Sequence, residues 1–542
     1  MGRELKFMIT VSAVLLVTAL LFQLLLVPGP FENKKQQSAA DTGPDPDIPE
    51  GRRLSEIHCS SCHKYPSPGL LPWQTWRFET LGAMAPFLGI DDPSTSSGSR
   101  DPQKNPYIPD SVYPAEPRVS EEEWQKIRAF YLSAAPRKLA RNEAKPRITV
   151  DSLYFRSRTP RMMPPDFPAV TAVAFDPGNR VLFIGEANES RILIFNQELE
   201  EVELYDTDSP VSHIKILGDT MKPGPRKILI TLIGNLYPGD APYGSVLYAR
   251  YDAEDQVMQV DSVLWDRIAR PVESQLADLD GDGSDDLLVN EFGHRAGNLF
   301  WMDNIGNKVQ HEKKILIDRP GCIQSHVMDY TRNGHRDILA LCTQTEQAIY
   351  LFENRGAGEF HRQTLLRFEV TAGSSSFEVH DFNQDGNPDI LYTSGDNADF
   401  SQTLKPYHGV YIYLNDGRGE FTEAWFYPVN GAYNAKARDF NGNGRLDIAV
   451  ISYFADYTNS PEEGFIYFEN QGDLSFIPYH HPAAGAGRWL TMDVADWTGN
   501  GRPDIVLGSF PEGPFANTSR NSEQWRGGPC FLVLENQSHG AE

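Results

Sequence analysis

The chain has 542 residues, too many for one ordinary hydrophobic core, so several domains or a repeat array are expected. Its 44 glycines and 39 prolines supply the many turns that an all-β array requires. The formal net charge of −25 at pH 7 argues against nucleic acid or an anionic membrane surface as the partner of the bulk of the chain.

Residues 1–27 are predicted to form a membrane segment. Phe7 to Val27 is a run of 21 uncharged residues, which is long enough to cross a bilayer, and Arg3 and Lys6 precede it as in a signal sequence. No small-x-small cleavage site follows directly, so we favour an uncleaved signal anchor over a cleaved signal peptide and a secreted protein. Residues 28–50 are rich in Pro, Asp, Gly and Gln and are predicted to be a flexible linker.

Residues 51–136 are predicted to form a small helical domain around Cys59-Ser-Ser-Cys62-His63, the C-x-x-C-H pattern of covalent c-type haem attachment. Two thiols one helical turn apart can add to the two vinyl groups of one porphyrin. The adjacent His63 then faces the iron as its proximal ligand. A C-x-x-C pair also occurs in redox and zinc sites, but a four-ligand zinc site is disfavoured because the next cysteine is Cys322.

Three helices are expected in this domain: from Gly51 to the motif, from Trp73 to Leu88, and from Ser120 to Ala135. Ser120 and Glu123 have the spacing of a capping box at the start of the last helix. With the haem motif, this pattern resembles a class I cytochrome c domain. The resemblance implies that the last helix packs on the first.

The distal iron ligand is the point where the sequence departs from that family. The family's methionine is expected shortly before the last helix, but residues 89–119 contain neither Met nor His. Met84 is the single methionine between residues 51 and 150, and we predict that it is the sixth ligand, which would raise the reduction potential. The alternatives are a purely structural Met84, a five-coordinate iron, and His58 as the ligand.

After a polar linker at residues 137–146, residues 147–542 consist of predicted strands in a repeated order. A nine-residue loop recurs at intervals of 51 to 58 residues, beginning at Asp278, Asp329, Asp381, Asp439 and Asp496. A strand leads into each loop, a buried strand leaves it, and a strand ending in Asn follows. Two eroded copies precede these five, around Val173–Asn196 and His213–Ala249. Four strands per repeat predict seven propeller blades, and the extra strand Arg147–Phe155 is expected to complete the last blade.

These repeats resemble the FG-GAP/VCBS repeats of integrin α-subunit propellers and of many bacterial exported proteins. From residue 51 to residue 536, the chain resembles bacterial exported proteins that fuse a class I-like cytochrome c domain to an FG-GAP/VCBS propeller. The resemblance implies a multidomain protein: a small all-α domain, an all-β seven-bladed propeller and an N-terminal transmembrane or signal-anchor helix.

The repeated loops are candidate calcium sites, because Ca²⁺ takes several oxygen ligands and positions 1, 3, 5 and 9 supply Asp and Asn side chains. The closing acid at position 9, followed by a strand, excludes an EF-hand. We rank the Asp278 loop first for its four carboxylates and the Asp381 loop second for its three. The alternative is that these side chains only cap the turn. The predicted ligands are Asp278, Asp280, Asp282, Asp286, Asp329, Asn333, Asp337, Asp381, Asn383, Asp385, Asp389, Asp439, Asn441, Asn443, Asp447, Asp496, Asn500 and Asp504.

The propeller offers two further candidate surfaces. Side chains just ahead of each loop are expected near the axis, as a substrate or metal site or as an ordinary polar channel lining: His213, Glu273, Ser274, Gln324, His326, Ser376, Asn434 and Thr491. Insertions after the buried strands are the expected partner surface: Asn290–Asn298, Ser394–Tyr407, Tyr453–Gly464 and Ser509–Gly528, with His294, Arg295, Asp396, Asp399, Trp525 and Arg526. Cys322 and Cys342 flank the second loop and are either a disulfide or two buried thiols.

Three functions are compatible with these features. The favoured one is electron transfer by a c-type cytochrome on the periplasmic side of the inner membrane. It would carry one covalent haem, a calcium-stabilised propeller as docking scaffold, and a redox protein or membrane electron-transfer chain as partner. The second is a periplasmic dehydrogenase whose propeller oxidises a small molecule and passes electrons to the haem. The third is an adhesion or glycan-binding propeller with a redox-sensing haem. No catalytic residue is assigned, and nucleic acid is not an expected partner.

Overall fold

The computed structural model describes residues 47–91, 105–140, 145–161, 167–303, 312–397, 403–513 and 521–538. The predicted membrane segment, residues 1–27, and most of the linker that follows it lie outside these ranges. Within them, no helix combines the length and the apolar character that a membrane span requires.

The helical domain contains the three predicted helices. The first, α2 (Asp47–His58), begins four residues ahead of Gly51 and ends immediately before Cys59. The second is a continuous helical stretch made of α3 (Trp73–Thr75), the π-helical η2 (Trp76–Thr80), α4 (Leu81–Met84) and the 3₁₀ turn η3 (Ala85–Leu88). The third is α5 (Glu121–Ala134), and two short 3₁₀ turns, η1 (Pro68–Leu70) and η5 (Asp110–Val112), lie between them.

The predicted capping box and the predicted packing of the last helix on the first are both present. Ser120 Oγ accepts a hydrogen bond from the Glu123 N–H at 3.2 Å, and the Glu123 carboxylate accepts one from the Ser120 N–H at 2.8 Å. Where α2 crosses α5, a Cβ on Gly51 would lie 2.1 Å from the Lys126 carbonyl oxygen, so only glycine permits this approach. Trp124 and Ile127 of α5 are buried in the core below the crossing.

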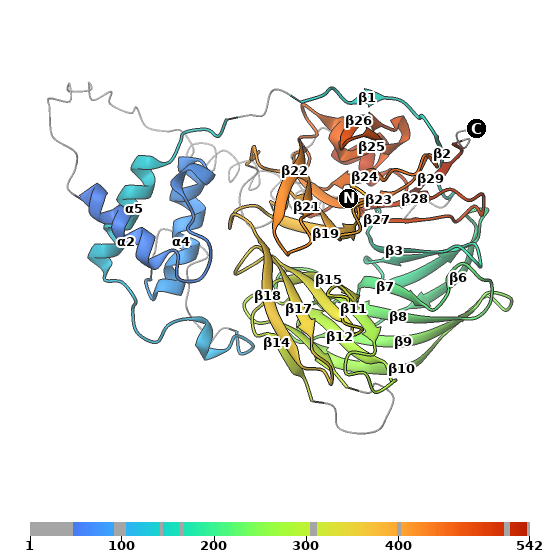
Figure 1. Cartoon of the computed structure of the whole chain (residues 1–542), viewed down its shortest axis with the longest axis horizontal. Coiled ribbons are helices and arrows are strands. Elements are labelled where there is room, and N and C mark those ends of the chain that lie inside the picture. Colours follow the sequence, from blue (N-terminus) through green and yellow to red (C-terminus); the bar gives the residue numbers. More distant parts are fainter. Residues whose placement is uncertain are drawn as a thin grey trace, which may run out of the picture. The chain divides into compact units, whose positions relative to one another are not determined.

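The remainder of the described chain forms seven sheets that stand around a common centre as propeller blades (Figure 1). The strand that begins each sequence repeat is the innermost of its sheet, and these seven inner strands contact one another around the ring. Blades 1 to 3 are β3 (Val170–Asp176), β4 (Val181–Glu186), β5 (Arg191–Phe195) and β6 (Glu201–Asp206); β7 (Val211–Leu217), β8 (Arg226–Leu232), β9 (Gly244–Asp252) and β10 (Val257–Ile268); and β11 (Pro271–Ala277), β12 (Asp286–Glu291), β13 (Asn298–Met302) and β14 (Lys314–Ile317).

Blades 4 to 7 continue in the same order. They are β15 (Cys322–Met328), β16 (Asp337–Cys342), β17 (Ala348–Asn354) and β18 (Phe360–Arg367); β19 (Ser374–His380), β20 (Asp389–Ser394), β21 (Gly409–Asn415) and β22 (Phe421–Pro428); β23 (Ala432–Arg438), β24 (Asp447–Ser452), β25 (Phe465–Gly472) and β26 (Ser475–His480); and β27 (Trp489–Ala495), β28 (Asp504–Ser509) and β29 (Phe531–Asn536). The short helices η6 (Pro461–Gly464), η7 (Pro482–Ala486) and α6 (Ser522–Arg526) lie in connections of the last two blades. The predicted seven-bladed propeller is confirmed.

The ring closes as predicted in principle but through different residues. The strand that completes blade 7 is β2 (Phe155–Arg158), which pairs antiparallel with β29. The expected closing strand, Arg147–Phe155, instead contributes β1 (Thr149–Val150), which adds in parallel to β26 of blade 6. The chain turns between β1 and β2, where the Asp151 carboxylate accepts the Leu153 N–H at 2.9 Å and Leu153 adopts φ 45°. This turn divides one expected strand between two blades.

The apolar core of the propeller lies between blades. Each of its seven main clusters of buried side chains draws on two neighbouring sheets, and the cluster that joins Phe175 of blade 1 to Val506 and Phe531 of blade 7 completes the circle. In the five blades that carry the repeated loop, every residue of the second strand is buried, as predicted. Apolar area buried on both faces of each sheet therefore holds the ring together.

The last Asp of each repeated loop is a buried structural group. Asp337 accepts the Asn354 N–H at 2.7 Å on one oxygen and the Thr331 N–H at 2.8 Å on the other. The Asn354 side chain in turn donates to the Leu279 carbonyl of blade 3 at 2.7 Å. This arrangement explains why an Asn ends the third strand of these blades. The corresponding pairs are Asp389 with Asn415, Asp447 with Asn470, and Asp504 with Asn536.

The two eroded blades use a different connection. Arg226, at the start of β8, forms a buried bidentate ion pair with Asp176, at the end of β3, with N–O distances of 2.7 and 2.8 Å. Asn179 also donates to Asp176 at 2.7 Å. Blades 1 and 2 are thus joined by a charged pair in place of the loop ligands that their sequences lack.

Candidate functional site

The C-x-x-C-H motif lies at the end of α2. Cys59 is half-buried, Cys62 is exposed and His63 is half-buried. The Nδ1 atom of His63 lies 2.9 Å from the Lys64 carbonyl oxygen. A donor proton on Nδ1 leaves the lone pair on Nε2, which is the arrangement that orients a metal-ligating histidine.

A cavity of about 1570 Å³ opens beside this motif. Cys59, Cys62 and His63 line it together with Met84, and Trp76, Leu81, Leu88 and Trp124 supply apolar wall. His58, the other distal candidate named from the sequence, also lines this cavity. The four predicted cofactor-binding residues therefore line one cavity, and its wall beside them is partly apolar, as a porphyrin site requires.

The environment of Cys59 disfavours one other use of a C-x-x-C pair, that of a reactive redox thiolate. Burial raises the pKa of the Cys59 thiol to about 11, although a hydrogen bond with Tyr131 opposes that rise. Nucleophilic redox cysteines have the opposite property, a depressed pKa that supplies the thiolate. A neutral, half-buried thiol suits a residue that ends as a thioether.

The propeller forms the remaining wall of the cavity, within the same compact unit, Asp47–Glu542. Two of the insertions predicted as a partner surface contact the helical domain of this chain. Tyr407 OH donates to the Leu70 carbonyl at 3.0 Å, and Thr403 Oγ1 lies 3.3 Å from Thr75 Oγ1. In the other insertion, the Arg295 guanidinium lies 5.3 Å from the ring centre of Phe87.

Other residues named in the insertions pack or form ion pairs within this chain. Trp525 is buried, with its ring centre 4.5 Å from that of Tyr457, and Arg526 pairs with Glu512 at 2.6 Å. Asp396 lines the cavity, and Asp399 lies outside the described residues.

The predicted polar ring at the propeller axis is present and is continuous with the cavity. Seven of its eight predicted members line the cavity: His213, Glu273, Gln324, His326, Ser376, Asn434 and Thr491. Ser274 does not belong to the ring, because its side chain is fully buried against Thr231 Oγ1 at 2.6 Å. Successive residues of a strand point to opposite sides, so a side chain next to Glu273 enters the sheet and not the channel.

Several ring side chains join neighbouring blades. Glu273 accepts the Ser325 N–H of the next blade at 2.6 Å, Gln324 accepts the Phe377 N–H at 3.0 Å, and Ser376 accepts the Ala435 N–H at 3.3 Å. These bonds satisfy inner-strand N–H groups that face the channel. His213 Nδ1 and Asn434 Oδ1 differ, because each is buried and has no hydrogen-bond partner among the described residues.

Sequence reasoning missed a second, charged ring two residues further along the inner strands. Lys215, Gln275, Lys436 and Asp493 line the cavity there. Glu378 lies on the same level, and burial opposes its ionisation, but Lys436, His380 and Arg438 together hold its pKa below the ordinary value. The period-two alternation of each inner strand is the signal that could have identified these residues.

Glu273 gives the channel a pH-dependent contribution to stability. Burial raises the pKa of Glu273 to about 7, although the Ser325 N–H and the charges of Lys215 and Lys436 oppose this. Because folding raises this pKa, the folded state binds the proton more tightly than the unfolded state. The contribution of Glu273 to stability is therefore fully present below the ordinary pKa of 4.5 and is lost as the pH rises through about 7. We expect Glu273→Gln to stabilise the protein by about 1–2 kcal/mol at pH 8 and to leave it nearly unchanged at pH 4. Melting temperature measured against pH checks this, and an equal effect at both pH values would contradict it.

The Asp278 loop carries the acidic oxygens of one candidate cation site. One oxygen each from Asp278, Asp280 and Asp286 lie within 4.8 Å of one another. Asp282 is not part of this group, and no comparable acidic triad occurs elsewhere in the described residues. Backbone N–H groups also bond these side chains: Asp278 accepts from Gly281 at 2.7 Å and from Gly283 at 3.0 Å. The turn-capping role is therefore present in the structure, and the spacing of the oxygens fits a cation as well.

Chelation is expected to destabilise the propeller mainly through the Asp278 loop. A cation that binds only the folded state at about 100 times its Kd contributes about 2.7 kcal/mol. The chelator-induced fall in melting temperature should nearly vanish in Asp278→Ala and persist in Asp439→Ala, whose loop has two carboxylates. Asp439 caps Gly442 and Gly444 in the same way, so the second variant controls for loss of the turn. Equal chelator effects in the two variants would overturn the ranking.

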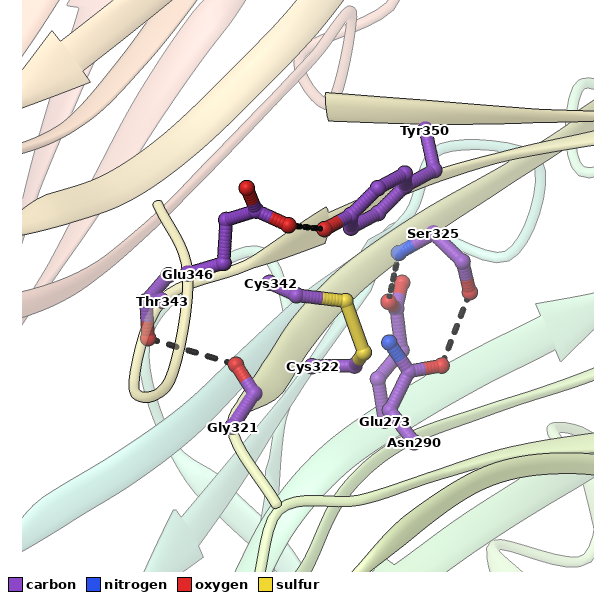
Figure 2. The surroundings of a disulfide bond; sticks show 9 residues. All are labelled: Glu273, Asn290, Gly321, Cys322, Ser325, Cys342, Thr343, Glu346 and Tyr350. Carbon is purple, nitrogen blue, oxygen red and sulfur yellow. Dashed lines mark hydrogen bonds between the residues drawn. A yellow bond between two sulfur atoms is a disulfide. The ribbon is translucent and has the colours of Figure 1, made fainter. Parts of the chain in front are cut away.

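Cys322 and Cys342 form a disulfide, the first of the two alternatives left open by the sequence (Figure 2). They are directly paired residues of β15 and β16. Figure 2 places Glu273, Asn290 and Ser325 nearby, where Ser325 donates to Asn290 at 2.8 Å and to Glu273 at 2.6 Å. The disulfide therefore stiffens the inner edge of blade 4, beside the polar ring. Cys530 is buried and unpaired.

Comparisons with known proteins identify the repeat. The sequence model of the FG-GAP-like repeat matches residues 329–392 and 398–450. Mouse phosphatidylinositol-glycan-specific phospholipase D is 29% identical over 139 residues, which are 24% of this chain and 15% of that protein. The crystal structure of Saccharomyces cerevisiae Sqt1 matches with a TM-score of 0.42 and 10% identity over 72% of this chain and 99% of that one.

The chain thus contains FG-GAP repeats in a seven-bladed β-propeller. The match to the mouse phospholipase spans only a small part of that protein. The repeat model lies within the propeller, so the cytochrome c resemblance of residues 51–136 stays a prediction.

Proposed function

We propose that this protein is a membrane-anchored extracytoplasmic c-type cytochrome that transfers electrons, with the propeller as a scaffold that covers and docks its redox site. The observation that supports this most is the convergence of Cys59, Cys62, His63 and Met84 on one cavity. A haem bound there supplies a one-electron ferric–ferrous couple.

Each residue of the motif has a distinct task in this proposal. The Cys59 and Cys62 thiols form the two covalent attachments, and the end of α2 directly before Cys59 fixes their direction. His63, oriented through its Nδ1 contact with the Lys64 carbonyl, would bind the iron through Nε2, and Met84 would supply the second protein ligand. Trp76, Leu81 and Trp124 exclude water from the cavity wall, which favours the less charged ferrous state.

The propeller has a structural and a docking role in this proposal. Calcium in the repeated loops, first in the Asp278 loop, fixes the connection between the inner two strands of a blade. The Cys322–Cys342 disulfide supports an oxidising compartment, which is also where haem is attached to C-x-x-C-H motifs. A redox protein or a membrane electron-transfer chain is the proposed partner. Residues 1–27 are proposed to anchor the protein in the inner membrane, with the rest of the chain on the periplasmic side.

A dehydrogenase is the second candidate, because the cavity extends from Cys59 and His63 to the polar ring. Its volume of about 1570 Å³ exceeds that of an ordinary cofactor pocket, which is about 300–1,000 Å³. Unpartnered His213 Nδ1 and Asn434 Oδ1 are free to bind a small polar molecule there.

Reduction of the purified haem-loaded protein separates the two functions. An electron carrier should be reduced and reoxidised by small redox mediators, and its spectrum should not respond to added alcohols, aldehydes or sugars. Reduction that needs such a molecule, and that His213→Ala abolishes, would favour the dehydrogenase. Glycan binding that is independent of haem oxidation state would favour the adhesion function.

A further inference from the structure

The loop between β12 and β13 of blade 3 is built to present Arg295 to the cavity. The carboxylate of Asp240 accepts three successive backbone N–H groups, from His294 at 3.1 Å, Arg295 at 2.6 Å and Ala296 at 2.8 Å. Arg270 holds the start of the loop by donating to the Gly293 carbonyl at 2.8 Å. Asp240 is only 4% exposed, so this loop is rigidly organised around a buried acceptor.

Gly293 makes this loop conformation attainable. It adopts φ +60°, and a Cβ there would lie 1.6 Å from the Ala296 carbonyl oxygen. Any other residue at this position must therefore displace the loop. Substitution at residue 293 can move Arg295 without changing its charge.

The Arg295 guanidinium is a half-buried cation with no acidic partner among the described residues. The guanidinium carbon lies 5.3 Å from the centre of the Phe87 ring of the helical domain, and the side chain is half-buried. Three other basic residues of the cavity wall are already engaged: Arg270 donates to backbone carbonyls, Lys405 donates to the Thr371 carbonyl, and Lys436 pairs with Glu378. The wall also contains Arg118, Lys215 and Arg319, but these three side chains are exposed to solvent. A cation taken partly out of water favours an anionic partner.

The cofactor implied by the motif carries two carboxylates. The thioether attachments at Cys59 and Cys62 fix one edge of the macrocycle, and the two propionate groups leave from another edge. Phe87 follows Met84 by three residues, so Arg295 contacts the helical stretch that carries the predicted distal ligand. Within the described cavity wall, the helical domain contributes Arg118 as its single arginine, and the propeller contributes Arg270, Arg295 and Arg319. Of these, Arg295 is the one that contacts the ring of Phe87 in the helical stretch before η5.

We propose that Arg295 of the propeller binds a propionate carboxylate of the haem held by the helical domain, so that one redox site is built from both domains. This inference rests on the proposed function. The positive charge of Arg295 then favours the ferrous state, because ferric haem carries one positive charge more.

The test is the reduction potential of the full-length, haem-loaded protein, measured by spectroelectrochemistry. Arg295→Gln is expected to shift the reduction equilibrium about tenfold toward the oxidised state, which corresponds to about 59 mV for a one-electron couple. Gly293→Ala keeps the arginine but moves its loop, and should shift the potential in the same direction. Arg295→Lys should restore part of the wild-type value.

Arg362→Gln is the control for loss of an arginine that lies over a ring, because Arg362 lies 5.6 Å from the centre of the Tyr350 ring but is exposed, on the outer strand β18. It should leave the potential unchanged. A haem-loaded Arg295→Gln protein with the potential of this control would overturn the inference and leave the proposed function standing. Wild-type protein without covalent haem would overturn both.

Discussion

Replacing Cys59 and Cys62 together with serine is expected to abolish covalent haem while leaving the propeller folded. A serine hydroxyl does not form the thioether that a thiol forms with a porphyrin vinyl group, so the effect should be all-or-none. The protein is to be made in a host with haem-c maturation and stained for haem after denaturing electrophoresis. Each single Cys→Ser variant should stain more weakly than wild type, since one attachment remains.

Two further variants give this experiment its controls. Cys530→Ser changes a buried cysteine outside the cavity wall and should keep the stain. Met84→Ala should also keep the stain, because the thioether bonds remain, but it should change the absorption spectrum if Met84 is the distal ligand. An unchanged spectrum would leave Met84 as a purely structural residue.

Asp337→Ala is expected to destabilise the propeller by about 3–5 kcal/mol. The substitution removes a fully buried acceptor and leaves the buried Asn354 N–H and the half-buried Thr331 N–H without a partner. Each unsatisfied buried donor costs about 1–3 kcal/mol. Denaturant unfolding in the presence of chelator measures the loss without a contribution from calcium.

Asp329→Ala is the matched control within the same loop. Its exposed carboxylate accepts the Asn333 and Gly334 N–H groups at 3.0 and 3.1 Å, where water can replace it. The loss should be about 1 kcal/mol or less. Similar losses in the two variants would show that the buried Asp–Asn pair is not what joins the second and third strands.

The architecture of the propeller was predictable because its signals are local and repeated. Five regularly spaced loops, each followed by an apolar strand and an Asn, indicated five blades. Two eroded copies with the same strand order indicated the other two. The physical role of the ninth residue was not predictable. In the sequence, an Asp that ends an acidic loop looks like a calcium ligand. The fold is needed to see that Asp337 and Asp389 accept hydrogen bonds from the buried N–H groups of Asn354 and Asn415.

The cavity was only half predictable. The C-x-x-C-H motif predicted Cys59, Cys62 and His63 as haem-binding residues, and Met84 was predicted because no other methionine lies nearby. The propeller side of the cavity depends on contacts between residues hundreds of positions apart. The Tyr407–Leu70 hydrogen bond is one such contact. No periodicity within a strand or a loop encodes such pairings. Two of the four insertions predicted as a partner surface thus contact this chain's own helical domain.

The most direct test of the central claim is the intact mass of the wild-type protein after expression with haem-c maturation. The account predicts a mass increased by one haem, an adduct that survives denaturation and is lost in the Cys59→Ser, Cys62→Ser protein. A wild-type chain whose cysteines are both unmodified, although a known c-type cytochrome made in the same cells carries its haem, would contradict it.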